Sequence, residues 1–262
     1  MFETLLYDVA DGVCRITLNR PQVYNALSPQ LIREITAAVE AAGADAAVRV
    51  VVLTGAGDKA FCSGADLKEG VATGAGGLAL GDSLRSGYHP MILAIRKLPK
   101  PVIGRLNGVA AGAGCSLALA CDVLIAADEA YLSQIFVNIG LMPDAGSTFF
   151  LPRLVGPLKA FELCSTGRRV YGPEAAQLGL VSRSVPAAAL DEAVREVVAY
   201  YAAAPTAAIG AMKQVLNQSL YSNLEDQLEQ EAVHQDSLGR SADAAEGIMA
   251  FLTKRKPAFR GL

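Results

Sequence analysis

The sequence predicts an α/β fold in which helices pack on a largely parallel sheet. Residues 50–53 and 102–106 are continuously or almost continuously apolar, as strands buried on both faces are. The middle of the chain repeats strand, turn and helix, which favours parallel pairing. A length of 262 residues with 52% hydrophobic content suffices for one large domain, or for a core with a small appendage.

The N-terminal elements are a hairpin and a helix. Residues 4–10 and 13–19 alternate around Asp11-Gly12, which is a strong hairpin signal. Ser28 as N-cap and Pro29 at the first helical position predict the start of a helix. Apolar residues then follow at helical spacing as far as Val39.

The central elements follow in order. Residues 70–87 are rich in Gly, Ala and Ser, which indicates a loop or a loosely held helix and a candidate lid. A helical pattern over 88–98 ends at two prolines, and the strand 102–106 comes next. Residues 116–120 predict a short buried helix, and 123–126 a further strand.

The C-terminal part of the chain is helical in pattern from about residue 157. This part is expected to form a separate subdomain or an oligomer-forming layer. The expected helices span residues 157–166, 172–178, 190–203, 205–218, 224–238 and 241–253.

Composition excludes several classes of protein. A net charge of −3 gives no general attraction to nucleic acid. The apolar run 112–127 is too short to span a membrane, and residues 1–4 lack a basic region followed by an apolar run, so no targeting segment is expected. Five cysteines without CxxC spacing indicate a reducing compartment, so a soluble cytoplasmic protein is expected. His89 and His234 lie far apart, which argues against a zinc site.

Three segments carry residues suited to chemistry. Two small-residue turns, 61–66 and 112–116, follow predicted strands, and exposed N–H groups there could form an oxyanion hole. Close packing of helix on sheet explains either turn alone equally well. Asp144 is the one acid in residues 138–148 and precedes an apolar helix start. It is either a catalytic acid or a helix cap.

Taken together, these motifs closely resemble those of the enoyl-CoA hydratase/isomerase (crotonase) superfamily over essentially the whole chain. The resemblance implies a spiral core of ββα repeats over 1–200 and a helical trimerisation region over 201–262. The motifs are Asn19-Arg20-Pro21, Asn25-Ala26-Leu27, Phe61-Cys62-Ser63-Gly64-Ala65-Asp66-Leu67, Lys100-Pro101-Val102-Ile103, Asn107-Gly108-Val109-Ala110-Ala111-Gly112-Ala113-Gly114, Cys121-Asp122, Gly140-Leu141-Met142-Pro143-Asp144-Ala145-Gly146, and residues 175–181 and 251–256.

The resemblance also implies an acyl-CoA thioester substrate, whose carbonyl oxygen is held by the N–H groups of Ala65 and Ala113. Coenzyme A then belongs to the substrate, and no separate cofactor is implied. Homotrimers, often paired into hexamers, are expected.

The resemblance decides which reaction is expected. Hydratases of the superfamily use two glutamates, whose places are taken here by Ser116 and Phe136. Neither can act as a carboxylate base. Asp144 as lone acid and base suits a double-bond shift or ring-epoxide rearrangement, as in the dienoyl-CoA and, more closely, the ring-1,2-epoxyphenylacetyl-CoA isomerases. An apolar setting is expected to raise its pKa.

Further residues have expected places around the site. Lys68, next to Asp66 and Leu67, either meets a CoA phosphate or is solvated. The resemblance implies that Phe251 and Lys254 reach the adenine end of CoA across a subunit boundary, whereas their spacing alone fits an ordinary core residue and a solvated one on an amphipathic helix. Tyr88, Phe136, Leu141 and Ser116 are expected in the acyl pocket, and the place of Glu162 is left open. Cys62 and Cys115 are expected to be packing residues.

Three alternatives remain. The first is a hydratase with an atypical active site. The second is an aryl-CoA hydrolase or dehalogenase with Asp144 as nucleophile. The resemblance pairs that activity with a tryptophan where Phe136 stands and a histidine near His89. The third is a CoA-binding homologue without chemistry.

Overall fold

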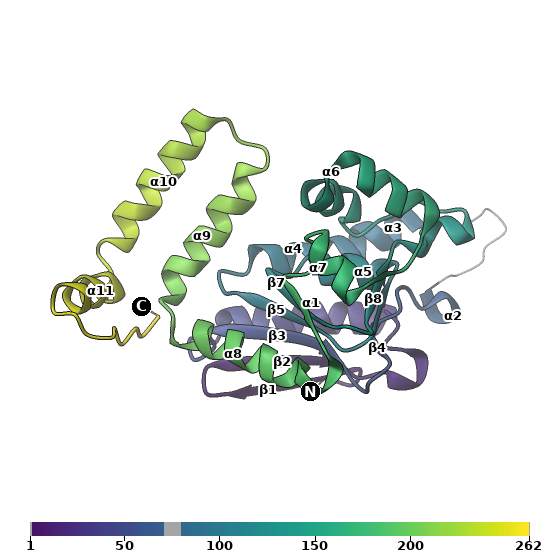
Figure 1. Cartoon of the computed structure of the whole chain (residues 1–262), viewed down its shortest axis with the longest axis horizontal. Helices are drawn as coiled ribbons and strands as arrows, with labels where there is room; N and C mark the ends of the chain where they lie inside the picture. Colours follow the sequence, from purple (N-terminus) through teal and green to yellow (C-terminus); the bar gives the residue numbers. More distant parts are fainter. Residues whose placement is uncertain (1, 71–79, 262) are drawn as a thin grey trace.

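Two sheets form the core of the chain, shown in Figure 1 as a computed structural model that describes residues 2–70 and 80–261. β1 and β2 form an antiparallel hairpin, and the later strands of the larger sheet run parallel. In order across that sheet, the strands are β1 (Leu5–Ala10), β2 (Val13–Leu18), β3 (Val50–Gly55), β5 (Val102–Leu106), β7 (Val123–Ala127) and β10 (Arg183–Val185).

The smaller sheet consists of very short strands. Its first three strands are parallel, and the last is antiparallel to its neighbour. They are β4 (Ala60–Cys62), β6 (Val109–Ala111), β8 (Tyr131–Ser133) and β9 (Val170–Tyr171).

The helices connect and cover these strands. The α-helices are α1 (Pro29–Ala44), α2 (Leu67–Gly70), α3 (Leu80–Ser83), α4 (His89–Lys97), α5 (Ala113–Leu119), α6 (Ser147–Thr166), α7 (Gly172–Gln177), α8 (Leu190–Ala203), α9 (Thr206–Ser219), α10 (Leu224–Leu238) and α11 (Ala242–Leu252). The short 3₁₀ or π segments are η1 (Pro21–Val23), η2 (Leu84–Tyr88), η3 (Ile135–Ile139) and η4 (Ala187–Ala189).

The structure confirms the predicted α/β fold with its parallel sheet. The expected hairpin is β1–β2, and every residue of β3 is buried. Ser28 caps α1, since its hydroxyl oxygen accepts a hydrogen bond from the Leu31 N–H at 3.2 Å. The helix buries an apolar face that includes Ile35 and Val39.

Two helix starts differ from the prediction. α5 begins at Ala113, three residues before the expected 116, because small residues carry no amphipathic signal there. α6 begins at Ser147 rather than 157. The helix start expected after Asp144 is thus the first half of α6, and the helix expected from 157 is its second half, since Gly156, with φ 77° and ψ 162°, breaks the helix between them.

The expected lid lies mostly outside the described residues, because 71–79 are not among them. Residues 80–88 form α3 and η2, so the helical interpretation holds for that part.

The C-terminal helices extend away from the sheets, and α9 and α10 lie side by side (Figure 1). The expected boundary between residues 200 and 201 falls inside α8, which packs on β3, β5 and β7. The division of the chain into a core and a C-terminal region at that boundary stays a prediction. In residues 2–70 and 80–261, no helix has the length and apolar character needed to cross a membrane.

Candidate active site

The register of the smaller sheet aligns the two small-residue turns. β4 and β6 are parallel neighbours, with Cys62 opposite Ala110. Ala65 follows Cys62 by three residues, and Ala113 follows Ala110 by three residues. Since parallel strands end at the same edge of a sheet, both turns lie side by side at that edge.

Ala65 is held so that its N–H faces away from the neighbouring segment around Leu27. The Leu27 N–H donates to Gly64 O at 2.8 Å, and the Asp66 N–H donates to Leu27 O at 3.0 Å. Because successive N–H groups of an extended chain point to opposite sides, the Ala65 N–H points away from Leu27. Ala65 itself lines the cavity described below.

Ala113 lies in the second small-residue turn. It is the first residue of α5, whose opening N–H groups have no partner within the helix. Gly112, with φ 53°, makes the turn, and its N–H donates to Ser133 O at 3.0 Å. The turns are in contact, because a Cβ on Gly64 would lie 3.5 Å from the Ala113 nitrogen.

A cavity of about 300 Å³ opens at these turns. Its wall is mainly apolar, and its carboxylates among the described lining residues are those of Asp66 and Asp144. The wall includes Leu27, Ile32, Gly64, Ala65, Leu67, Leu84, Tyr88, Gly112, Ala113, Ile135, Phe136, Ile139 and Leu141. The structure thus brings Asp144, Ala65, Ala113, Tyr88, Phe136 and Leu141 together, as the sequence predicts.

Asp144 faces this cavity from the turn between η3 and α6. Burial raises the pKa of its carboxyl from 3.8 to about 6, in the expected direction. Its Oδ1 atom is covered and has no hydrogen-bond partner among the described residues. The cap of α6 is Gly146, with no side-chain hydrogen bond, so the alternative interpretation of Asp144 as a helix cap is wrong.

Tyr88 and Phe136 flank the acid with aromatic rings. Each is only 7% exposed. Burial, and next the negative charge of Asp144, raise the pKa of the Tyr88 phenol, which keeps it neutral. This part of the cavity therefore combines aromatic walls with one ionisable acid that has no ion-pair partner among the described residues.

Ser116 was expected to line the pocket, and this prediction is wrong. It is fully buried in α5 and is not among the residues that line the cavity. Its hydroxyl instead donates to the backbone oxygen of Asp144 at 2.9 Å. Sequence spacing could not show this contact, because it depends on how the turn at Asp144 folds over α5.

The three residues that follow Ala65 have different places. Asp66 lines the cavity, but its carboxylate is 2.9 Å from the Arg20 guanidinium and also accepts from the Lys68 N–H at 3.1 Å. Leu67 lines the cavity and is 55% exposed. The Lys68 side chain is exposed and lies outside the lining. Contacts of these residues with CoA stay predictions.

Three other residues of interest lie away from the cavity. Phe251 is 84% exposed on α11, Lys254 follows that helix, and neither lines the cavity of its own chain. Their contact with CoA across a subunit boundary stays a prediction. His89 is exposed and does not line the cavity, which leaves Asp144 without the histidine of the dehalogenase alternative.

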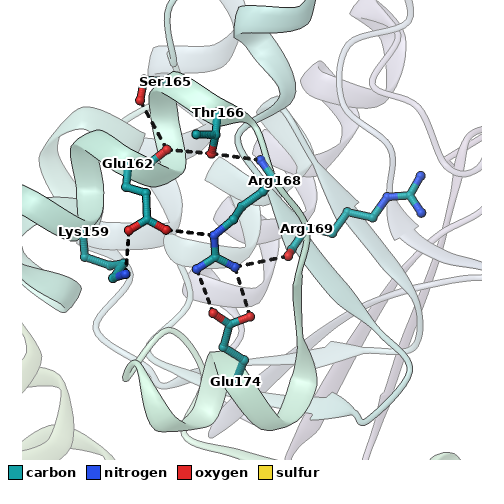
Figure 2. Close-up of polar contacts among 7 residues, drawn as sticks. All are labelled: Lys159, Glu162, Ser165, Thr166, Arg168, Arg169 and Glu174. Atoms are coloured by element: carbon teal, nitrogen blue, oxygen red, sulfur yellow. Dashed lines mark hydrogen bonds and ion pairs between the residues drawn. The ribbon is translucent and has the colours of Figure 1, made fainter.

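Glu162 belongs to a charged cluster at the end of α6, not to the cavity (Figure 2). Its carboxylate lies 2.6 Å from Lys159 Nζ and 3.0 Å from Arg168 Nε. Arg168 also donates two hydrogen bonds to Glu174 of α7, at 2.7 and 3.1 Å. The cluster links α6 to α7. Glu162 therefore takes part in a contact between helices and does not line the cavity.

Cys62 and Cys115 lie within the two small-residue turns, near Ala65 and Ala113, and are protonated packing residues. Burial raises the pKa of both thiols to about 12. A Cβ on Gly114 would lie 2.2 Å from Cys62 O, so β4 and α5 pack too closely there for any larger residue.

Comparisons with known proteins agree with this geometry. The family model for enoyl-CoA hydratase/isomerase matches residues 8–261. A Rhodobacter capsulatus protein named "Probable enoyl-CoA hydratase" is 45% identical over 99% of both chains. The 1,2-epoxyphenylacetyl-CoA isomerase of Escherichia coli is 37% identical over all of both chains.

A solved structure agrees as well. The crystal structure of an enoyl-CoA hydratase from Bacillus anthracis superposes with a TM-score of 0.92 at 36% identity, covering 99% of this chain and 100% of that one. The expected crotonase architecture of mixed α/β sheets with a helical C-terminal region is thus confirmed. The chain belongs to the enoyl-CoA hydratase/isomerase family.

Proposed function

We propose that this enzyme is an acyl-CoA isomerase that uses Asp144 as its acid and base. The observation that carries this proposal is the single unpaired carboxylate of the described cavity wall, beside the two donor turns. The relatives include proteins named as hydratases and as an isomerase, so the choice depends on the site residues. Ser116 and Phe136 supply no second carboxylate.

The proposed reaction moves one proton. The Asp144 carboxylate takes a proton from the carbon next to the thioester carbonyl of a 3-enoyl-CoA. The C–H electron pair moves into the conjugated system, and the negative charge that develops on the carbonyl oxygen is stabilised by the N–H groups of Ala65 and Ala113. Asp144 then returns the proton at C4, which leaves a 2-enoyl-CoA. A well-placed base of this kind contributes about 10²–10⁴-fold.

The aromatic wall formed by Phe136 and Tyr88 favours a ring-bearing acyl group, for which the same enolate would support rearrangement of a ring epoxide. Catabolism of phenylacetate-like or unsaturated acyl-CoA esters in the cytoplasm is the proposed setting. The five cysteines are all free thiols, as a reducing compartment requires.

The test uses 3-hexenoyl-CoA in deuterated water. Wild-type enzyme should give 2-hexenoyl-CoA, with deuterium incorporated to the extent that the shuttled proton exchanges. Asp144→Asn should abolish turnover while ester binding persists. Rapid hydration of crotonyl-CoA without isomerisation would overturn the proposal in favour of an atypical hydratase. A covalent adduct on Asp144 in mass spectra would favour the nucleophilic alternative.

We further propose a homotrimer or a dimer of trimers. The support is exposed apolar surface on the C-terminal helices, since α10 buries none of its residues in the single chain. Sedimentation velocity should give three or six times 27.3 kDa, and a monomer would contradict this proposal. Exposed apolar side chains include Met212, Leu216, Leu224, Leu228, Ile248 and Phe251.

A further inference from the structure

A buried series of hydrogen bonds, from Gln134 through Ser147 and Ser116, leads to the backbone oxygen of Asp144. Ser116 Oγ lies 2.9 Å from Asp144 O and 2.7 Å from Ser147 Oγ. Gln134 Nε2 lies 2.9 Å from Ser147 Oγ. Ser116 and Ser147 are fully buried, and Gln134 is only 3% exposed.

The number of available protons decides which group donates in each of these hydrogen bonds. A serine hydroxyl has one proton, and the nearest carbonyl to Ser116 Oγ is Asp144 O at 2.9 Å, against 3.4 Å for Gly112 O. Ser116 therefore donates to Asp144, so Ser147 must donate to Ser116. The Gln134 amide in turn donates to Ser147, and all three donors point toward the Asp144 carbonyl.

The carboxyl of Asp144 depends on this support. Its Oδ1 has no hydrogen-bond partner among the described residues, so backbone position is what places the side chain. The turn is itself unusual, because Ala145 has a φ of 47°. Non-glycine residues adopt such angles when the surrounding structure holds them there. Two hydrogen bonds converge on Asp144 O, from Ser116 Oγ and from the Ser147 N–H at 3.1 Å.

Ser116 also connects the two halves of the site. It lies three residues after Ala113 in α5, almost one helical turn along the same helix. One bond from its side chain thus joins the helix that carries a proposed oxyanion donor to the turn that carries the proposed base.

We propose that Ser116, supported by Ser147 and Gln134, is a positioning residue that fixes the Asp144 carboxyl relative to the Ala113 N–H. This inference depends on the proposed use of Asp144 as a base. It assigns Ser116 a role through the backbone of Asp144, without contact with substrate.

The experiment compares Ser116→Ala with Ser133→Ala during turnover of 3-hexenoyl-CoA. Ser133 is the matched control, because its buried hydroxyl also donates to a backbone carbonyl, Gly167 O at 2.7 Å, but does not contact Asp144. Ser116→Ala should lower kcat about 10- to 100-fold, since misplacement by ~1 Å costs about that much. KM and the pH midpoint of the rate should stay unchanged, and Ser133→Ala should keep kcat.

A second variant tests whether Ser147 acts through its hydrogen bond to Ser116. Ser147→Ala keeps the backbone donor to Asp144 but removes the bond to Ser116, so it should lower kcat less than Ser116→Ala does. The double variant should lose no more than Ser116→Ala alone, because Ser147 acts through Ser116. Equal kcat in the Ser116 and Ser133 variants, or additive losses in the double variant, would overturn the inference. Wild-type turnover in Asp144→Asn would instead overturn the proposed function.

Discussion

The Arg20 guanidinium lies 2.9 Å from the carboxylate of Asp66, with both side chains about nine-tenths buried beneath the first donor turn. Arg20 also donates to Ala26 O at 2.6 Å, and Asp66 accepts from the Lys68 N–H at the start of α2. The pair therefore joins the segment around Leu27 to the neighbouring turn at Ala65, and both residues line the cavity.

Asp66→Ala should destabilise the protein by about 3–5 kcal/mol, because it removes the carboxylate that lies 2.9 Å from the buried Arg20 guanidinium. Urea unfolding of the variant measures this loss. The matched variant Arg20→Ala and the double variant complete a cycle that isolates the pair. A loss below about 0.5 kcal/mol, typical of surface substitutions, would mean that the pair contributes little to the fold.

The rate of isomerisation should depend on pH through Asp144. Its pKa of about 6 means that the carboxylate is the main form above pH 7, and activity should fall as the pH drops through 6. The profile of kcat/KM for 3-hexenoyl-CoA measures the midpoint. A midpoint near the ordinary value of 3.8 would show that desolvation does not act on the free enzyme as described.

The same pKa predicts how stability changes with pH. Since the folded pKa lies above the ordinary 3.8, the folded state binds the proton more tightly than the unfolded state. The stability that proton binding at Asp144 gives the folded state is fully present below pH 3.8 and is lost as the pH rises through about 6. Asp144→Asn, which cannot ionise, should therefore unfold at a higher temperature than wild type at pH 8.

The difference between these two proteins in thermal unfolding should shrink toward pH 4. Equal unfolding temperatures for wild type and Asp144→Asn at pH 8 would contradict the raised pKa of the folded state.

Gly64→Ala should strongly reduce turnover. The φ of Gly64 is +103°, and an added Cβ would lie 2.8 Å from Ala111 O, so the turn that presents the Ala65 N–H must move. Loss of one oxyanion donor costs about 10²–10³ in rate. Gly140→Ala is the control, since its φ is +73° with open space around a Cβ.

The control should cost about 1–2 kcal/mol in stability, from backbone strain alone, with kcat retained. Steady-state kinetics and thermal unfolding of both variants separate these effects. Equal kcat in the two glycine variants would remove the Ala65 turn from the proposed mechanism.

Arg168→Ala should lower the unfolding temperature by releasing α7 from the end of α6. Arg168 contacts Glu162 and Glu174, and both carboxyls have pKa values lowered by their hydrogen bonds to cationic side chains. The effect should shrink in 1 M salt, where the Debye length is about 3 Å. Arg195→Ala, which removes an exposed pair with Glu192, should leave the unfolding temperature unchanged.

The sequence was sufficient to locate the two small-residue turns and Asp144, which line one cavity, because each stands out locally; their catalytic roles came from the family resemblance and stay predictions. Small residues follow a buried strand in both turns, and Asp144 is isolated among uncharged residues. The smaller sheet was missed, because strands of two or three residues such as β4 and β9 are too short to show alternation. The place of Ser116 was wrong for a different reason. Its contact joins residues 28 positions apart, and such a contact leaves no local signal.

The equal spacing of Ala65 and Ala113 from the paired residues Cys62 and Ala110 separates two kinds of sequence change. Both proposed donors are backbone N–H groups, so replacing either alanine by serine leaves the donor in place. Deleting one residue between Cys62 and Ala65 moves one donor out of step with the other by a full residue, about 3.3 Å of chain. Descendants of this sequence can therefore vary the side chain at either alanine, but not the length of either turn.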